Sequence, residues 1–241
     1  MRLRLPPTAL LLSGLALGSA LHAATPVVPP AESIVDEVVV TGSSKPYKLT
    51  GKQLATALRV YRKYRPAYAP EGRLYFQVKQ RTGGRDLSGL TLSLRSGAHT
   101  IPLTLDTHSR FVLPPLVGDD WTLVANRGSG RLTIMPVVMS PGTSEHDVRL
   151  GDMRLSCEIA WAAFVKPSLS FLMRGLAAAV PACRTSRVAM FVTGDRRIAD
   201  ASVMTGGRSA AVELSPDRKE WRYPGYDKRL PNDARVRFRF E

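Results

Sequence analysis

Residues 90–105 read LTLSLRSGAHTIPLTL, and the fold class follows from this stretch. Apolar and polar residues alternate on both sides of Gly97, which is typical of two half-buried strands joined by a turn. Similar strand patterns occur at residues 73–78, 109–114, 121–124 and 132–138. The sequence therefore predicts a mainly β protein, of α+β class because helical patterns also occur.

The C-terminal part of the chain has a similar layout. Residues 187–192, 201–214 and 221–224 follow one another with about the spacing of residues 73–78, 90–105 and 111–114. An internal duplication and a chance likeness between two β-meanders are both open interpretations. With either, we expect two small β-sandwich-like units, at residues 73–156 and 184–241.

Two helical patterns accompany the strands. Residues 50–66 predict a short N-terminal helix, which a Thr-Gln capping box begins and a proline ends. Residues 157–183 contain an apolar stripe at helical spacing. The stripe consists of Leu169, Leu172, Met173, Leu176 and Val180. Charged residues and a proline interrupt this stretch, so we expect a core helix and not a membrane span.

The chain has two cysteines, Cys157 and Cys183. In an oxidising compartment such a pair favours a disulfide, which here would pin the central helix. In the chain-entropy description, closing this loop stabilises the fold by about 3 kcal/mol. The spacing of cysteines and histidines matches no zinc site, and we expect neither a metal nor a cofactor.

The N-terminal residues have the three parts of an export signal. Two arginines give a positive start, residues 10–21 are largely apolar, and small residues follow. About a dozen apolar residues are too few to span a membrane in the mature protein. We expect residues 1–23 to be a signal peptide, with cleavage after Ala20, Ala23 or Ala24 as the alternatives. An uncleaved anchor is the other interpretation of this segment. The expected location is the periplasm, with outer-membrane association as an alternative.

A flexible segment follows the leader, over residues 24–49, and begins with a proline-rich tether at residues 25–33. It contains the run Asp36, Glu37, Val38, Val39, Val40, Thr41 and Gly42. These seven residues resemble the TonB box of TonB-dependent outer-membrane receptors, in which an acidic pair precedes VVVTG. The resemblance implies a strand that adds to the sheet edge of an envelope protein. An ordinary first strand is the alternative.

Residues 73–140 resemble the carboxypeptidase-regulatory-like and transthyretin-like β-sandwiches. The resemblance rests on short strands, Gly turns and the motif SRF-x-LP at residues 109–114. It implies a non-catalytic sandwich. Ser109 stands where such folds usually have glycine.

The chain is strongly basic, with a formal net charge of +14. Such a charge attracts anionic partners, and the codon bias of a GC-rich genome is the alternative explanation. In the last strand Arg235, Arg237 and Arg239 alternate with apolar residues. They predict a docking strip for an anionic glycan or lipid, with a solvated sheet face as the alternative. The chain has no nucleic-acid-binding motif, and we expect no nucleic acid partner.

Few residues suggest catalysis. The histidines outside the leader are His99, His108 and His146. Asp106 and His108 form a spacing that is commonplace in turns and do not predict an acid–base pair. Asp119, Asp120 and Asp227 are better explained as turn residues than as cation ligands.

We therefore expect a non-enzymatic binding or scaffold protein of the periplasm. One alternative is an accessory of a TonB-dependent transport system, which engages TonB through residues 36–42. The other is an envelope hydrolase whose site includes His108 or His146.

Overall fold

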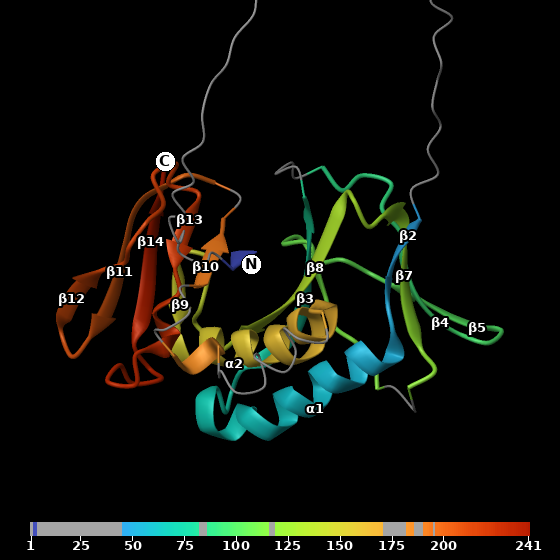
Figure 1. Cartoon of the computed structure of the whole chain (residues 1–241), viewed down its shortest axis with the longest axis horizontal. Helices are drawn as coiled ribbons and strands as arrows, with labels where there is room; N and C mark the ends of the chain where they lie inside the picture. Colours follow the sequence, from blue (N-terminus) through green and yellow to red (C-terminus); the bar gives the residue numbers. More distant parts are fainter. Residues whose placement is uncertain are drawn as a thin grey trace, which may run out of the picture. The chain divides into compact units, whose positions relative to one another are not determined.

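The structure is a computed structural model that describes residues 2–3, 45–81, 86–115, 119–170, 182–185, 190–194 and 196–241. These residues form two sandwich-like sheet pairs and the helices packed against them (Figure 1). The prediction of a mainly β fold with two sandwich-like units and a disulfide beside the central helix is confirmed. The TonB-box-like run lies outside the described residues.

The first sheet pair holds strands β2 to β8. One sheet has the order β2-β7-β4-β5 and the other the order β6-β3-β8. The strands are β2 (Pro46–Leu49), β3 (Arg73–Gln80), β4 (Leu92–Ser96), β5 (His99–Leu103), β6 (Arg110–Phe111), β7 (Thr122–Gly128) and β8 (Leu132–Met139). In β8 every second side chain is buried, as the alternating sequence requires. β2 falls within residues 24–49, which the sequence predicted to be flexible.

The second sheet pair has the orders β12-β11-β14-β9 and β1-β10-β13. Its strands are β1 (Arg2–Leu3), β9 (Asp147–Arg149), β10 (Met190–Thr193), β11 (Ile198–Thr205), β12 (Arg208–Ala211), β13 (Glu220–Arg222) and β14 (Arg235–Phe240). β9 precedes the boundary that the sequence suggested for this unit, residue 184, and joins it through β14.

The two sheet pairs have the same strand order. β9-β14-β11-β12 repeats β2-β7-β4-β5, and β13-β10 repeats β6-β3. Leu94 lies opposite Leu123 in the first pair, as Val203 lies opposite Val236 in the second. The hairpins β4–β5 and β11–β12 both turn through two residues. The likeness therefore extends from strand order to the register of the hydrogen-bonded ladders.

A similar turn precedes β6 and β13. The Ser109 N–H donates to the Asp106 carbonyl and the Arg218 N–H to the Ser215 carbonyl, each at 2.9 Å. Ser109 and Arg218 have positive φ angles, 60° and 57°. This left-handed conformation favours glycine. Ser109 and Arg218 therefore occupy equivalent turn positions in the two sheet pairs.

Helix α1 (Gly51–Tyr68) follows β2. The capping box is present: Thr50 Oγ1 accepts from the Gln53 N–H at 3.3 Å, and Gln53 Oε1 accepts from the Thr50 N–H at 3.0 Å. The prediction of a short helix that ends at Pro66 is wrong, since α1 has 18 residues and includes Pro66. Pro66 lies in the last turn, where its missing N–H removes only one helical hydrogen bond.

The central helix is α2 (Leu150–Ala160). The π-helical η1 (Trp161–Val165) and α3 (Lys166–Ser168) continue it, and η2 (Ala182–Arg184) follows later. Cys157 in α2 and Cys183 in η2 form the predicted disulfide, with their Cα atoms 5.9 Å apart. The helix begins seven residues before Cys157, so the boundary predicted at residue 157 is wrong. Of the predicted apolar stripe, Leu172 to Val180 lie outside the described residues.

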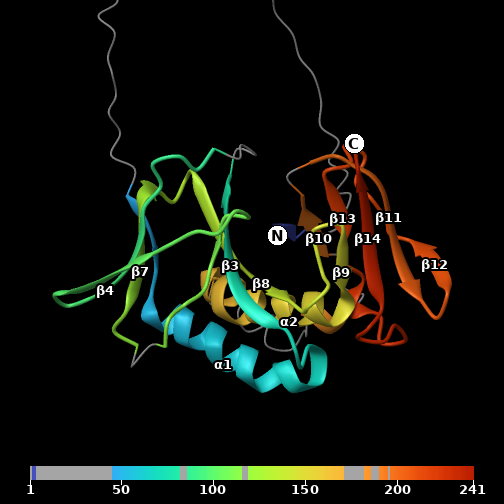
Figure 2. The ribbon, with the colours of Figure 1, turned by 180° about the vertical axis from the view of Figure 1, so that it is seen from behind.

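The two helices lie side by side across one end of the sheets (Figure 1 and Figure 2). Arg154 of α2 donates to the carbonyls of Gly225, Asp227 and Leu230 and to the side chain of Asn232. Asn232 Nδ2 in turn donates to the Ala67 carbonyl of α1, at 2.8 Å. These bonds connect α1, α2 and the segment that leads into β14.

Side chains cover the outer edge of β8. The Val138 N–H donates to Ser156 Oγ and the Ser140 N–H to Asp152 Oδ2, both at 2.8 Å. The backbone of Ile134 hydrogen-bonds to the Tyr47 hydroxyl. Pro136, between them, has no N–H. The edge of the first sheet pair thus offers few free donors to another strand.

Candidate functional site

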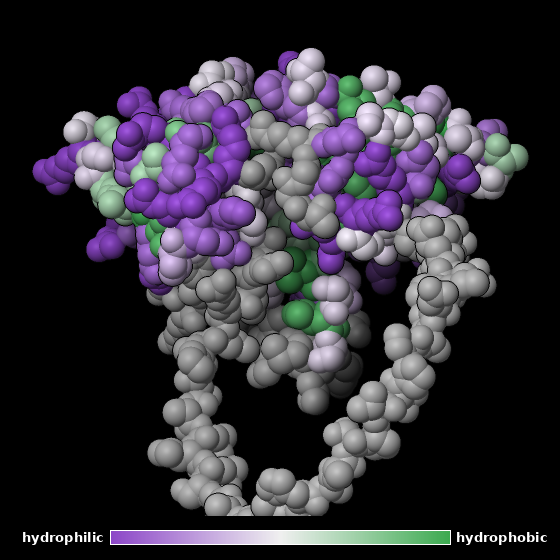
Figure 3. Space-filling view, turned by 90° about the horizontal axis from the view of Figure 1, so that it is seen from above, coloured by the Kyte–Doolittle hydropathy of each residue, from purple (hydrophilic) through white to green (hydrophobic). Residues whose placement is uncertain are grey.

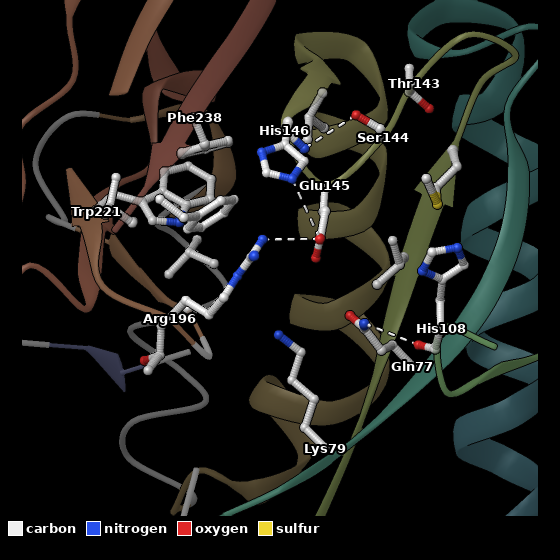
Figure 4. Close-up of a pocket in the computed structure, with 18 of the residues that line it drawn as sticks. Gln77, Lys79, His108, Thr143, Ser144, Glu145, His146, Arg196, Trp221 and Phe238 are labelled. Carbon is white, nitrogen blue, oxygen red and sulfur yellow. Dashed lines mark hydrogen bonds and ion pairs between the residues drawn. The ribbon is translucent and has the colours of Figure 1, made fainter. Parts of the chain in front are cut away.

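A cavity of about 530 Å³ lies between residues of the two sheet pairs. This volume falls within the range of about 300–1,000 Å³ that small-molecule sites have. The first sheet pair contributes residues of β3, β6 and β8, and the second contributes residues of β10, β11, β13 and β14. The loop at residues 143–146 lines it as well. Figure 4 shows how the side chains point into it.

One wall of the cavity is aromatic. Trp221 of β13 and Phe238 of β14 have ring centroids 4.9 Å apart, and Phe238 and Phe240 have centroids 6.1 Å apart. The alternation of β14 puts both phenylalanines on the same face, because every second side chain of a strand points the same way. Phe238 is largely buried in this cluster, so Trp221 and Phe240 form the more exposed part of the wall.

Charged side chains border this aromatic wall. The Arg196 guanidinium lies 4.1 Å from the Phe240 ring centroid, a cation–π contact. Arg196 also donates to Glu145 Oε1 at 3.0 Å, and His146 Nε2 lies 3.6 Å from the same oxygen. The Phe238 N–H donates to the His146 carbonyl at 2.8 Å, which holds this loop against β14. Figure 4 shows Glu145 between Arg196 and His146.

The opposite wall carries polar side chains of the first sheet pair. Gln77, Lys79, His108 and Arg110 line it. Arg110 is held by Asp106, whose Oδ2 accepts from the guanidinium at 2.9 Å. Partial burial opposes the charged form of Asp106, but hydrogen bonds from Arg110 and His108 outweigh it and keep the pKa of Asp106 below its ordinary value.

These two walls together suit an anionic ligand with an apolar body. Three cationic side chains, Lys79, Arg110 and Arg196, are among the described lining residues. Arg110 pairs with Asp106 and Arg196 with Glu145, so a ligand anion would share or displace these carboxylates. An aromatic surface would hold the apolar part, while the cations would attract a carboxylate or phosphate. Viewed from above, hydrophilic residues cover much of both sides of the molecule and hydrophobic residues show between them (Figure 3).

The structure places the predicted site residues in different regions. Arg235, Arg237 and Arg239 lie on the face of β14 that points away from Phe238 and Phe240. Asp147 of β9 pairs with two of them, with oxygens 2.9 Å from Arg235 Nε and 3.7 Å from Arg237 Nε. Arg239 lies opposite Asp200 in the ladder. The chain's own carboxylates therefore partly neutralise the predicted anion-docking strip.

His108 and His146, far apart in the sequence, both line the cavity. Asp106 does not pair with the His108 imidazole, because its Oδ1 accepts from the His108 backbone N–H at 2.8 Å. This is the local bond of a turn and not an acid–base pair. His99 lies on β5, and it is absent from the cavity lining.

Two of the three acidic residues considered for a cation bind protein groups instead. Asp120 accepts from Ser96, and Asp227 binds Arg229 at 2.8 Å. The hydrogen bond from Arg229 lowers the pKa of Asp227. Within the described ranges, no three His, Cys, Asp or Glu side chains gather as a metal site would require. The helices of the described segments include none that is both long and apolar enough to cross a membrane.

Comparisons with known proteins found no match to this chain among family models, curated proteins or solved structures.

Sequence reasoning did not find Glu145, Arg196 or Trp221 as site residues. The sequence did indicate a strand at Trp221, because this residue corresponds to Phe111 in the similar layout of the two β-units. That correspondence predicts a strand position and not a role in a site. Glu145 and Arg196 lie in connections between strands, where residue type has no periodic pattern. Nothing in the sequence indicates that these three residues are neighbours.

Proposed function

We propose that this protein binds a small anionic ligand with an apolar body in the cavity between its sheet pairs, as a non-enzymatic binding module of the periplasm. The observation that carries the proposal is the combination of an aromatic wall with three cationic side chains around one cavity. Export is supported by the leader-like N-terminus and by the disulfide, which persists in oxidising compartments.

Calorimetric titration with decyl phosphate tests this proposal, with uncharged decanol as the matched ligand. We expect decyl phosphate to bind, and decanol to bind about tenfold more weakly, because it lacks the charged head. Arg196→Gln should weaken binding by about the same factor, since a charge-assisted bond is worth roughly 1.4 kcal/mol or more. Trp221→Leu should weaken both ligands equally, because it removes only apolar contact.

Glu145→Gln should have the opposite effect and tighten decyl phosphate binding, because it removes the carboxylate that pairs with Arg196. Arg229→Gln is the matched control, since the Arg229 side chain is 90% exposed and does not line the cavity. Unchanged affinity in both Arg196→Gln and Trp221→Leu would place binding elsewhere and overturn the proposal.

The hydrolase alternative makes a different prediction about the same cavity. It requires that His108→Ala or His146→Ala abolish cleavage of an ester or cell-wall substrate. The binding proposal expects no turnover by the wild-type protein. Measured turnover that either substitution removes would favour the hydrolase.

The resemblance of residues 36–42 to a TonB box supports a second proposal, that this run engages TonB. A strand that adds to a partner's sheet needs its backbone N–H groups. Val39→Pro removes one of them and should abolish binding to the periplasmic domain of TonB. Equal capture of TonB by the wild type and by Val39→Pro would contradict this second proposal.

A further inference from the structure

Helix α1 and the strand before it carry positive charge without any negative charge between. Residues 45–70 contain seven Lys and Arg and no Asp or Glu. The seven are Lys45, Lys48, Lys52, Arg59, Arg62, Lys63 and Arg65. A segment whose charges all have one sign attracts partners of the opposite sign.

Four of these cations share the outer side of α1 and form what we call its cationic face: Lys52, Arg59, Arg62 and Lys63. Lys52, Arg59 and Lys63 follow one another at intervals of seven and four residues, a spacing that places them on one side of a helix. All four side chains are exposed, whereas Leu54 on the opposite side is fully buried. In both ribbon views α1 is the outer of the two neighbouring helices (Figure 1 and Figure 2).

The cationic face differs from the arginine strip of β14 in having no carboxylate beside it. In the described part of the chain, none of its four cations forms an ion pair, while two arginines of β14 share Asp147. Arg59 donates to the Thr56 hydroxyl at 3.1 Å, and the Lys63 ammonium lies 5.0 Å from the Tyr64 ring centroid. Both contacts are with neutral groups, so the charge of the face is not compensated.

The chemistry of this face distinguishes between classes of anionic partner. The tyrosines of α1, Tyr61, Tyr64 and Tyr68, pack against the core, so the cationic face has no aromatic side chain on which the rings of a polymer could stack. From Lys52 to Lys63 the row is about 17 Å long, at about 1.5 Å per residue. An exposed row of four Lys and Arg on an amphipathic helix is typical of attraction to anionic lipid headgroups.

We propose that the cationic face of α1 docks this protein on the surface of a bilayer that contains anionic phospholipids. The contact is electrostatic, because the apolar side of α1 stays in the core and only the cations meet the lipid phosphates. Such attraction fades beyond about 8 Å at physiological ionic strength, so the face must lie close to the headgroups. None of its four residues lines the cavity, and docking therefore does not require a ligand there.

Co-sedimentation of the full chain with lipid vesicles tests the proposal. We expect at least about tenfold stronger partitioning onto vesicles of phosphatidylglycerol and phosphatidylcholine in equal parts than onto phosphatidylcholine alone. Binding through an apolar segment would appear equally on both, so the difference isolates the contribution of charge. Raising the ionic strength to about 1 M should remove the difference, because the screening length falls to about 3 Å.

The double substitution Arg59→Gln and Lys63→Gln should weaken partitioning onto the anionic vesicles by at least about tenfold, since each cation near such a surface contributes about fivefold. Glutamine is a good helix former, so α1 should remain folded, which thermal unfolding checks. Lys52→Gln with Arg62→Gln should give a similar loss independently.

Arg237→Gln with Arg239→Gln is the matched control, because it removes the same net charge from the exposed face of β14. It should weaken partitioning by less than about threefold. An equal loss in this control and in the α1 variants would overturn the proposal, because net charge alone would then explain the attraction.

Equal partitioning of the wild type onto the two kinds of vesicle would also overturn the proposal. So would tighter binding to soluble polygalacturonate than to the anionic vesicles, lost in the same α1 variants, because the partner would then be an acidic polymer. Arg196→Gln should leave vesicle binding unchanged while it weakens decyl phosphate binding, so the cavity proposal and this one can fail separately.

Discussion

The first and second sheet pairs have one strand order and different sources of stability. The first buries the larger hydrophobic cluster, which includes Phe76, Leu94 and Ile134. The second buries a smaller cluster and adds the disulfide and the hydrogen bonds of Arg154. Apolar burial, a covalent link and charge-assisted hydrogen bonds can thus stabilise the same topology in different proportions.

Removing the disulfide should give the largest loss of stability among the changes that test this difference between the two sheet pairs. The double substitution Cys157→Ala and Cys183→Ala should lower the free energy of unfolding by about 3 kcal/mol, because the unfolded chain regains the freedom of the closed loop. The loss should fall on the second sheet pair first. Urea unfolding with hydrogen exchange measured at β4 and β11 checks this. Equal loss of protection in both strands would contradict a separate role for the disulfide in the second pair.

Two glycines at the starts of α1 and α2, Gly51 and Gly151, test whether the two sheet pairs also resemble each other where strand leads into helix. An added Cβ would lie 1.9 Å from the Asp119 carbonyl oxygen at Gly51 and 2.0 Å from the Tyr68 carbonyl oxygen at Gly151. Each follows the strand before a helix, so Gly51→Ala and Gly151→Ala should each lower stability by roughly 2–3 kcal/mol through steric overlap.

The control for both is Gly130→Ala, where a Cβ would meet nothing within 4 Å. Thermal unfolding of the three variants is the measurement. If only one of Gly51→Ala and Gly151→Ala loses stability, the close approach of the glycine to a backbone carbonyl matters in one sheet pair and not in the other.

Substitution of Asp152 tests whether the side chains of α2 that cover the edge of β8 contribute to stability. Asp152 is fully buried and accepts from the Ser140 N–H and Ser140 Oγ. Asp152→Ala should lower the free energy of unfolding by about 2 kcal/mol, because both donors would be left without an acceptor. Ser144→Ala, which removes only an exposed hydroxyl contact, is the control in the same urea titration. A loss no greater than that of Ser144→Ala would contradict the role of Asp152 at this edge.

The pH dependence of Asp152 follows from its burial, which raises its pKa above 3.8 despite the hydrogen bonds from Ser140. A carboxyl whose pKa is higher in the folded state stabilises the fold most below its unfolded pKa, and this contribution is lost as the pH rises through the folded pKa. Asp152→Asn should therefore gain stability relative to the wild type as the pH rises from about 4. A constant difference between the two across pH 3–7 would contradict the raised pKa.

Substitution of Arg184 should give the smallest change in stability among these predictions. Arg184 donates to Glu158 Oε1 at 2.6 Å and lies 5.0 Å from the Tyr64 ring centroid, so it connects η2 with both helices. Its side chain is 38% exposed, and solvent screening limits its contribution. Arg184→Met should lower stability by about 1 kcal/mol. Arg229→Met, whose cation is far more exposed, should change it by less than about 0.5 kcal/mol in the same assay.

Local sequence patterns were sufficient to predict several strands and the start of a helix. The alternation in residues 90–105 predicted β4 and β5, and Thr50 with Gln53 predicted the start of α1. The end of α1 was predicted too early at Pro66, because a proline in the last turn can be accommodated. The start of α2 was missed, because the disulfide suggested a boundary at Cys157 where the backbone has none.

The sequence by itself thus determined the fold class, the disulfide and the similar layout of the two β-units, because side-chain periodicity and cysteine count are properties of the chain. Only the tertiary structure decided which residues meet. It brought Glu145, Arg196 and Trp221 to one cavity, used α2 to cover the edge of β8, and left β10 with a two-residue partner. Such contacts depend on how distant segments pair and pack, and that information is spread over the whole chain.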